Sequence, residues 1–326
     1  MNELYPLKFK PIFKEKVWGG NRISRVLKQN YAPLPNCGEV WLISGVPGNE
    51  SIVTKGFLKN NTLPELVEVY MGDLVGDKVF EKFGYEFPLL FKFIDTEEYL
   101  SVQVHPDDEL ALHRHGTLGK TEMWYILKAD DDAELISGFN KMVTQNDYLF
   151  HLKNKSLKEI LNFEKAEKGD VFFIPAGHVH AIGPGILLAE IQQSSDVTYR
   201  IYDWDRFDVA GMTRELHTDL ALDAIDFTKS GSNKTHSVVV KNRPVLIQES
   251  DFFMVNLIDA DLKLDRDCSE IDSFIVHLCT EGGYDLICGG ESLKISIGEA
   301  VLIPAVIDEF QIDPRPNCKI LETYIV

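Results

Sequence analysis

Short β-type segments separated by turn residues dominate this chain, and one of them occurs twice. The segment GDVFFIPAG at 169–177 is echoed by GEAVLIPAV at 298–306. After a polar, turn-rich stretch at 228–235, which is expected to be a linker, the rest of the sequence consists of evenly spaced short strands. Such spacing is typical of an antiparallel sandwich or barrel. The repeat therefore predicts that the chain contains two copies of one β-barrel module.

Two segments interrupt the strand pattern. Residues 62–84 carry apolar side chains at helical spacing after Thr62, a candidate N-cap, and residues 142–168 also have a helical pattern. We interpret both segments as helical insertions in a first domain that covers residues 1–230. A smaller C-terminal domain, residues 236–326, is expected to be all β. The sequence thus predicts a mainly β fold of two barrels, the first carrying helical insertions.

Composition limits the classes of partner. The chain has 326 residues, which suits two domains, and a net charge of −18, which disfavours nucleic acid and anionic membranes. No stretch approaches the roughly 18 apolar residues of a membrane span. The N-terminus lacks the features of a signal peptide, so we expect a cytoplasmic protein. The 5 cysteines form no CxxC pair and are expected to be buried, reduced thiols.

A candidate metal site comes from three separate segments. Gln103 and His105 in LSVQVHPDD alternate with apolar residues, so both side chains project from one face of a strand. Glu122 in GKTEMWY lies on the next strand pair, and His180 in PAGHVHAIG follows a glycine turn. Two imidazoles, one carboxylate and one amide oxygen suit zinc with an open position. Three other histidines compete as ligands in the same regions, namely His113, His115 and His178.

Several motifs resemble those of a known family. LSVQVHPDD, GKTEMWY, GDVFFIPAGHVHAIGPG and LLAEIQQSSDVTYRIYDWDR, together with VWGG and GEVWLIS, look like the type I mannose-6-phosphate isomerases, particularly the short bacterial form. They lie within residues 17–206 in the family's order. The resemblance implies a cupin fold, a jelly-roll β-barrel, and an aldose–ketose isomerase. It also implies one zinc ion per chain, held by Gln103, His105, Glu122 and His180.

The implied substrate is a phosphorylated hexose, which an acidic chain has to bind through a local group of cations. Lys92, Lys120 and Arg200 are predicted to converge on one pocket together with the hydroxyl of Ser101. Lys120 shares a strand face with Glu122, which places it beside the predicted metal. Arginine binds a phosphate through a planar fork and lysine binds it as a point charge. We therefore expect these four residues to bind the substrate.

Interconversion of mannose 6-phosphate and fructose 6-phosphate moves a proton between C1 and C2 through a cis-enediol. The reaction requires stabilisation of the enediolate oxygen and a group that shuttles the proton. We expect zinc to polarise or orient the sugar oxygens and Arg200 to stabilise the enediolate. Lys120 or Glu190 would shuttle the proton, and the sequence leaves the choice between them open.

Two other functions remain open at this point. One is a metal cupin of another class, an oxygenase or an epimerase, although iron oxygenases use more imidazole ligands. The other is a sugar-binding cupin without turnover. His178 departs from the residue often found at its position in the family and is expected at the pocket rim. The C-terminal domain, whose one strand histidine, His277, has no evident partner, is expected to be structural and to pack against or cover the first barrel. The chain is expected to be a monomer or a homodimer.

Overall fold

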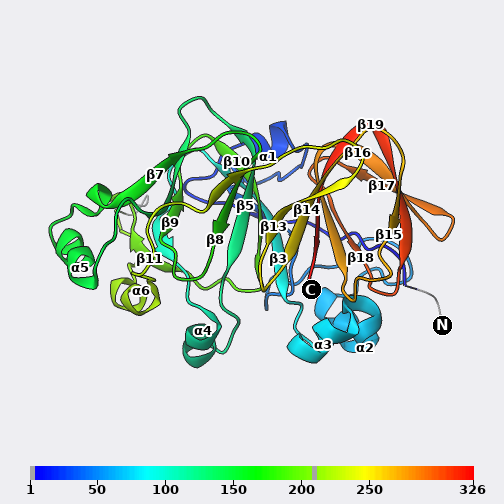
Figure 1. Cartoon of the computed structure of the whole chain (residues 1–326), viewed down its shortest axis with the longest axis horizontal. Helices are drawn as coiled ribbons and strands as arrows, with labels where there is room; N and C mark the ends of the chain where they lie inside the picture. Colours follow the sequence, from blue (N-terminus) through cyan, green and yellow to red (C-terminus); the bar gives the residue numbers. More distant parts are fainter. Residues whose placement is uncertain (1–3, 208–210) are drawn as a thin grey trace.

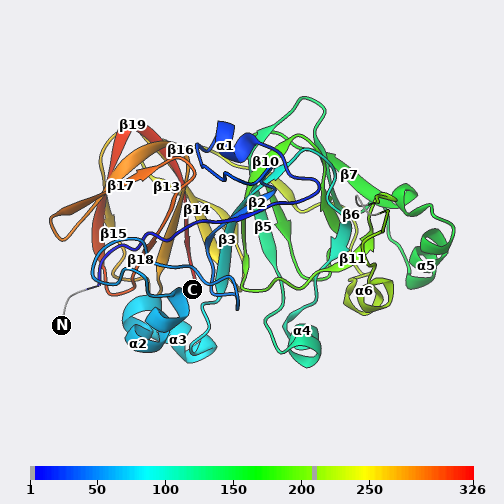
Figure 2. The same cartoon turned by 180° about the vertical axis from the view of Figure 1, so that it is seen from behind.

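The computed structural model describes residues 4–207 and 211–326. Two β-rich halves lie side by side, and the helices lie at the periphery (Figures 1 and 2). The strands form three sheets, two of seven strands and one of five. The prediction of a mainly β fold is therefore confirmed.

The first half contains two sheets, and neighbouring strands are antiparallel in both. The seven-stranded sheet has the order β1-β2-β3-β10-β5-β8-β12, with bounds Ile12–Lys14, Glu39–Ile43, Leu89–Thr96, Ile186–Gln193, Glu122–Ala129, Asp170–Ile174 and Lys234–His236. The five-stranded sheet has the order β11-β4-β9-β6-β7, with bounds Tyr199–Tyr202, Val102–Val104, His180–Ile182, Glu134–Phe139 and Leu161–Lys165. β12 overlaps the stretch expected to be a linker, which thus contributes an edge strand to the first sheet.

The second half is a seven-stranded sheet of order β13-β14-β19-β16-β17, in which β15 pairs with β19 and β18 pairs with β16. The bounds of β13 to β19, in chain order, are Pro244–Glu249, Met254–Ala260, Leu264–Asp267, Ile275–Cys288, Glu291–Ser296, Ala300–Ile303 and Glu309–Tyr324. The cysteines are free thiols, and all except Cys288 are buried. The expected burial is therefore confirmed for the other cysteines.

The repeated sequence segment occupies corresponding places in the two halves. In the first half it forms β8, in the local order β3-β10-β5-β8, and in the second it forms β18, in the local order β14-β19-β16-β18. Ile174 of the first copy pairs with Glu122, and Ile303 of the second pairs with Ile275. The strand order thus agrees with the predicted repeat of one module, and the predicted domain bounds stay a prediction.

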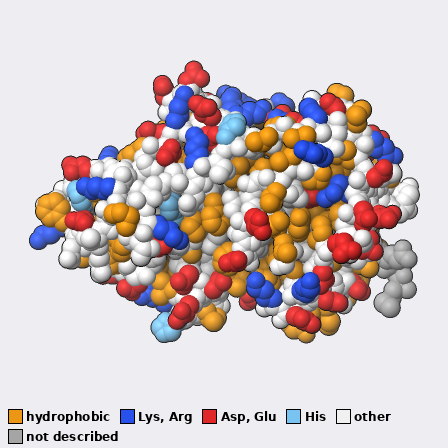
Figure 3. Space-filling model, in the orientation of Figure 1, with side chains coloured by type: hydrophobic (Ala, Val, Ile, Leu, Met, Phe, Trp, Pro, Cys, Tyr) orange, Lys and Arg blue, Asp and Glu red, His pale blue; other side chains and the backbone are white. Residues whose placement is uncertain are grey.

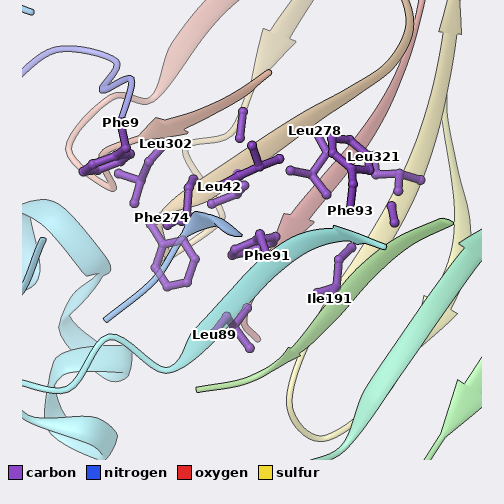
Figure 4. Packing of buried hydrophobic residues seen from close by; sticks show 14 of the residues in the cluster. Phe9, Leu42, Leu89, Phe91, Phe93, Ile191, Phe274, Leu278, Leu302 and Leu321 are labelled. Carbon is purple, nitrogen blue, oxygen red and sulfur yellow. The ribbon is translucent and has the colours of Figure 1, made fainter. Parts of the chain in front are cut away.

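β3 is buried along its whole length because the sheet is covered on both faces. Phe91 and Phe93 belong to an apolar core that also contains Phe274 and Leu321 of the second half (Figure 4). Lys92 alternates with these phenylalanines and therefore faces the opposite side, the inside of the first half. The seven-stranded sheet that contains β3, called the central sheet below, thus lies between the second half of the molecule and the interior of the first.

The helices are short and lie outside the sheets (Figure 1). Their bounds are Arg22–Arg25 (α1), Leu63–Val75 (α2), Asp77–Phe83 (α3), Asp108–His115 (α4), Gln145–Lys153 (α5) and Thr218–Ala224 (α6), with a 3-10 helix η1 at Leu157–Glu159. α2 begins at the predicted cap, where Thr62 and Glu65 form a reciprocal capping box. Among the described residues, no helix is both long and apolar enough to cross a lipid bilayer.

The helical prediction for 142–168 is right only in its first part. α5 occupies the beginning of this segment, but residues 161–165 form β7, which pairs with β6. The backbone hydrogen bonds between β6 and β7 outweigh the local helical preference of residues 161–165. Only this local preference is visible in the sequence. The sequence analysis also missed α1, α4 and α6, which are too short to show a clear helical period.

A buried ionic network lies inside the second half. Glu322 Oε2 is 3.2 Å from His277 Nε2, and Glu322 Oε1 is 2.7 Å from a terminal nitrogen of Arg266. His277 Nδ1 lies 3.0 Å from the hydroxyl of Tyr284. Burial alone would raise the pKa of Glu322, but the His277 hydrogen bond and the Arg266 charge outweigh it and hold the pKa at about 2. The expectation that His277 has no partner is therefore wrong.

We predict that Glu322→Gln lowers the free energy of unfolding at pH 7 by about 3 to 5 kcal/mol, because Arg266 loses its buried carboxylate partner. The folded-state pKa of Glu322 lies below the unfolded value of about 4.3. The wild type therefore loses this stabilisation as the pH falls from about 5 towards 2, and the difference from the variant narrows. Urea unfolding at pH 7 and pH 3 measures both effects, with the exposed Glu291→Gln as control. An equal difference at the two pH values would contradict the prediction.

Candidate functional site

Three of the predicted metal ligands meet inside the first half. His105 follows β4, Glu122 begins β5 and His180 begins β9. His180 Nε2 is 3.3 Å from Glu122 Oε1, and His105 Nε2 is 3.6 Å from Glu122 Oε2. The three residues are buried, and their ligand atoms lie within 4.8 Å of one another. This spacing allows a single ion to contact all three side chains.

Hydrogen bonds orient both imidazoles towards the same point. His105 Nδ1 lies 3.0 Å from the carbonyl oxygen of Val197, and His180 Nδ1 lies 2.8 Å from that of His178. A carbonyl oxygen only accepts, so each Nδ1 carries the proton and each Nε2 presents a lone pair. His105 Nε2 and both carboxylate oxygens of Glu122 are buried without a hydrogen-bond partner. Because buried polar atoms are rarely left unpaired, a cation fits this group.

The protonation tendencies of the three residues agree with a ligand set. Burial lowers the pKa of His180 to about 3, and burial, reinforced by Lys120, lowers that of His105 well below its usual range. Both imidazoles are therefore neutral, which is the form that binds a metal. Burial, followed by the charge of Glu190, raises the pKa of Glu122 to about 8. A divalent cation would favour its ionised form, and this donor set suits zinc among other transition metals.

Gln103 lies beside these residues. It pairs with His180 across β4 and β9, and its Nε2 is 3.2 Å from His180 Nε2. The oxygen and nitrogen of an amide side chain exchange places by rotation, so the oxygen can occupy the same position. The structure thus brings all four predicted ligands together.

The three competing histidines lie elsewhere. His178 is buried, and its Nε2 is 3.0 Å from Ser137 Oγ. It is not among the residues that line the cavity described below, and its expected position at the pocket rim stays a prediction. His113 and His115 are exposed on α4, and His115 Nε2 is 2.8 Å from the hydroxyl of Tyr199.

A cavity of about 440 Å³ is lined by Gln103 and by Lys120, whose Nζ is 3.4 Å from Glu122 Oε2, so the cavity lies next to the ligand candidates. Six of its lining residues were predicted from the sequence, namely Lys92, Ser101, Gln103, Lys120, Glu190 and Arg200. The lining residues that were not predicted include Lys14, Lys16, Glu39, Trp41, Trp124, Asp196 and Arg214. Acidic side chains are spread over the face of the molecule seen in Figure 3, in accord with the net charge of −18. The cavity is therefore a locally cationic site in an acidic protein.

Lys92 and Glu190 form a buried ion pair across β3 and β10. Lys92 Nζ donates to Glu190 Oε1 at 2.9 Å and to Gln192 Oε1 at 2.6 Å. Glu190 Oε2 accepts a hydrogen bond of 2.8 Å from Trp124 Nε1. Burial acts to lower the pKa of Lys92, but the charges of Glu190 and Glu39 outweigh it and raise this pKa. Lys92 is therefore charged, and two of its three donors are already engaged within the protein.

Lys120 and Arg200 lie on the other sides of the cavity. Lys120 Nζ is 3.4 Å from Glu122 Oε2, next to the metal ligand candidates. Arg200 Nε donates to Ser101 Oγ at 3.3 Å, and one terminal nitrogen donates to the carbonyl oxygen of Glu215 at 2.8 Å. Burial lowers the pKa of Arg200 without neutralising a group whose ordinary pKa is this high. Among the residues that the structure describes, both hydrogen-bond acceptors of the guanidinium are uncharged oxygens, so this group is able to bind an anion.

β1 and β2 supply three of the cavity residues that were not predicted, namely Lys14, Glu39 and Trp41. Trp41 pairs with Lys92 across β2 and β3, and Glu39 lies two residues before Trp41 on the same face. The i, i+2 spacing of Lys14 and Lys16 and of Glu39 and Trp41 was visible in the sequence. A charged residue on a strand is usually solvated, however, and nothing local distinguishes it from one that faces a cavity.

Comparison with known proteins identifies several similar chains. A family model described as phosphomannose isomerase type I, catalytic domain, matches residues 6–148. Mannose-6-phosphate isomerase ManA of Bacillus subtilis is 36% identical over 320 residues, which cover 96% of this chain and 97% of that protein. The probable mannose-6-phosphate isomerase GmuF of the same organism is 34% identical over 321 residues, covering 95% and 96%. A crystal structure of the mannose 6-phosphate isomerase from Bacillus subtilis matches with a TM-score of 0.85 at 30% identity, covering 98% of this chain and 99% of that chain.

We predict that His105→Ala weakens zinc binding at least about tenfold, because it removes one of the imidazole nitrogens that converge on Glu122. His113→Ala, which removes an exposed imidazole on α4 outside this group, is the matched control and should bind zinc as the wild type does. Titration with a chromophoric zinc chelator measures both affinities. Wild-type affinity in His105→Ala would show that the ion does not bind here.

Proposed function

The chain belongs to the type I mannose-6-phosphate isomerase family, and we propose that it interconverts mannose 6-phosphate and fructose 6-phosphate. The resemblance inferred from the sequence motifs is thereby confirmed, and the mainly β architecture is that of the cupin fold. The observation that carries the proposal is the buried group of His105, Glu122 and His180 beside a cavity lined by cations. Family membership disfavours the oxygenase and epimerase alternatives.

We propose that the chain holds one Zn²⁺ through Gln103, His105, Glu122 and His180. The unpaired ligand atoms of His105 and Glu122 and the fixed tautomers of both histidines support this assignment. When bound, zinc supplies a Lewis acid that polarises sugar oxygens and favours the negative charge of the enediolate. The cytoplasmic location and the monomeric or homodimeric state expected from the sequence stay predictions.

The remaining residues would hold the sugar phosphate and move the proton. Arg200, whose described hydrogen-bond acceptors are uncharged, would bind negative charge on the enediolate or on the phosphate, together with Ser101. The oxygens of Glu190 already accept hydrogen bonds from Lys92 and Trp124, whereas Lys120 lies next to Glu122 at the metal site. These contacts favour Lys120 as the group that carries the proton between C1 and C2, with Glu190 holding Lys92 in place.

We predict that purified protein converts mannose 6-phosphate to fructose 6-phosphate and that chelation lowers kcat by on the order of a hundredfold or more. Adding zinc back should restore turnover. A coupled assay that follows fructose 6-phosphate measures the activity before and after each step. A zinc-loaded protein without turnover would contradict the isomerase proposal and favour a sugar-binding protein.

We predict that Lys120→Met lowers kcat by about 10² to 10⁴ while zinc binding is retained, because a proton-transfer group is lost. Lys128→Met, which changes an exposed lysine on β5, the strand that follows Lys120, is the control and should leave kcat unchanged. Glu190→Gln is the comparison variant. Full activity in Lys120→Met together with inactive Glu190→Gln would transfer the proton-carrying role to Glu190.

A further inference from the structure

The cations that line the cavity differ in whether a carboxylate lies close enough to neutralise their charge. Four of the six have a carboxylate within 4.0 Å, in the pairs Lys16 with Glu39, Lys92 with Glu190, Lys120 with Glu122 and Arg214 with Asp203. Among the described residues of the lining, only Lys14 and Arg200 lack such a partner. A dianion entering this cavity meets uncompensated positive charge at these two side chains.

Lys14 is held over the cavity by uncharged groups. Its Nζ donates to Asn49 Oδ1 and lies 4.9 Å from the centre of the Trp41 ring. Lys92 Nζ lies 5.0 Å from the centre of the same ring. The indole thus positions the Lys14 ammonium without neutralising it, as in other cation–π contacts.

The register of the central sheet directs Lys14 to the side on which Lys92 lies. Lys14 pairs with Glu39 across β1 and β2, and Glu39 pairs with Ile94 across β2 and β3. Directly paired residues lie on one face of a sheet, and Ile94 is two residues from Lys92 on that face. Lys14 therefore points into the cavity for a topological reason, independent of its own rotamer.

Glu39 does not neutralise Lys14, because its oxygens are engaged by other groups. Its Oε1 is 2.9 Å from Lys16 Nζ, and its Oε2 accepts a hydrogen bond of 2.7 Å from Trp41 Nε1. Burial opposes ionisation, but the charges of Lys92 and Lys16 outweigh it and hold the pKa of Glu39 at about 2. Glu39 is thus ionised, and its oxygens contact Lys16 and Trp41. The Lys14 ammonium is therefore left able to bind a ligand.

We propose that Lys14 is a further substrate-binding residue, which holds the phosphate group of the sugar together with Arg200. This inference rests on the proposed function. Arg200 comes from the five-stranded sheet and Lys14 from the seven-stranded sheet, so the phosphate would be held from both walls of the cavity. Arginine supplies a fork and lysine a point charge. Two of the three donors of Lys92 are engaged within the protein. In this arrangement Lys14 therefore supplies a contact to the phosphate that Lys92 is poorly able to make.

The first test is kinetic. Lys14→Met is expected to raise KM for mannose 6-phosphate by about 10- to 100-fold, the equivalent of one charge-assisted hydrogen bond, with kcat within about twofold of wild type. Lys14→Arg should recover most of the loss, because it restores the charge. Lys10→Met, which changes an exposed lysine on the same segment, is the control and should have wild-type constants. An unchanged KM in Lys14→Met would overturn the proposal.

The second test does not need turnover. Calorimetric titration of the zinc-loaded protein with inorganic phosphate should give an affinity about tenfold or more weaker in Lys14→Met than in wild type and Lys10→Met. An inactive wild type whose phosphate binding depends on Lys14 would refute the isomerase function and keep the anion site. An active wild type whose phosphate affinity is the same in all three proteins would refute the role of Lys14 alone.

Discussion

The positions of the cavity residues depend on the central sheet, which is buried on both faces. Phe91 and Phe93 on β3 pack into the apolar core shared with the second half, so β3 has no freedom to slip in register. A shift of one residue would move these rings into the cavity and Lys92 into the core. The second half therefore fixes the position of every cavity residue on this sheet, although none of its own side chains lines the cavity.

Pairing of buried charges is the second requirement, because an uncompensated buried charge is costly. Lys92 with Glu190 and Lys120 with Glu122 satisfy it within the protein. Together with the pairs of Lys16 with Glu39 and Arg214 with Asp203, they place a carboxylate beside four of the six cations that line the cavity. Specific recognition of a phosphate then depends on the few cations that the fold leaves without a carboxylate.

The two halves share a local strand order but carry different residues at corresponding positions. Glu190 pairs with Trp124 beside an open cavity, whereas Glu322 at the corresponding place pairs with His277 in a network closed by Arg266. Ile275 stands where Glu122 stands in the first half, so the second half has no carboxylate at the metal position. The first half thus carries the candidate metal site, and the second half, with a closed ionic network at the corresponding place, packs against it.

The sequence by itself determined the features that depend on residues close together in the chain. Alternation on a strand placed Gln103 and His105 on one face, and the cap at Thr62 located the start of α2. Tertiary structure alone decided that Lys14 faces the cavity, that His277 has an ionic partner and that residues 161–165 form a strand. The physical reason is that each of these depends on pairing between strands distant in sequence, which leaves no local pattern to detect.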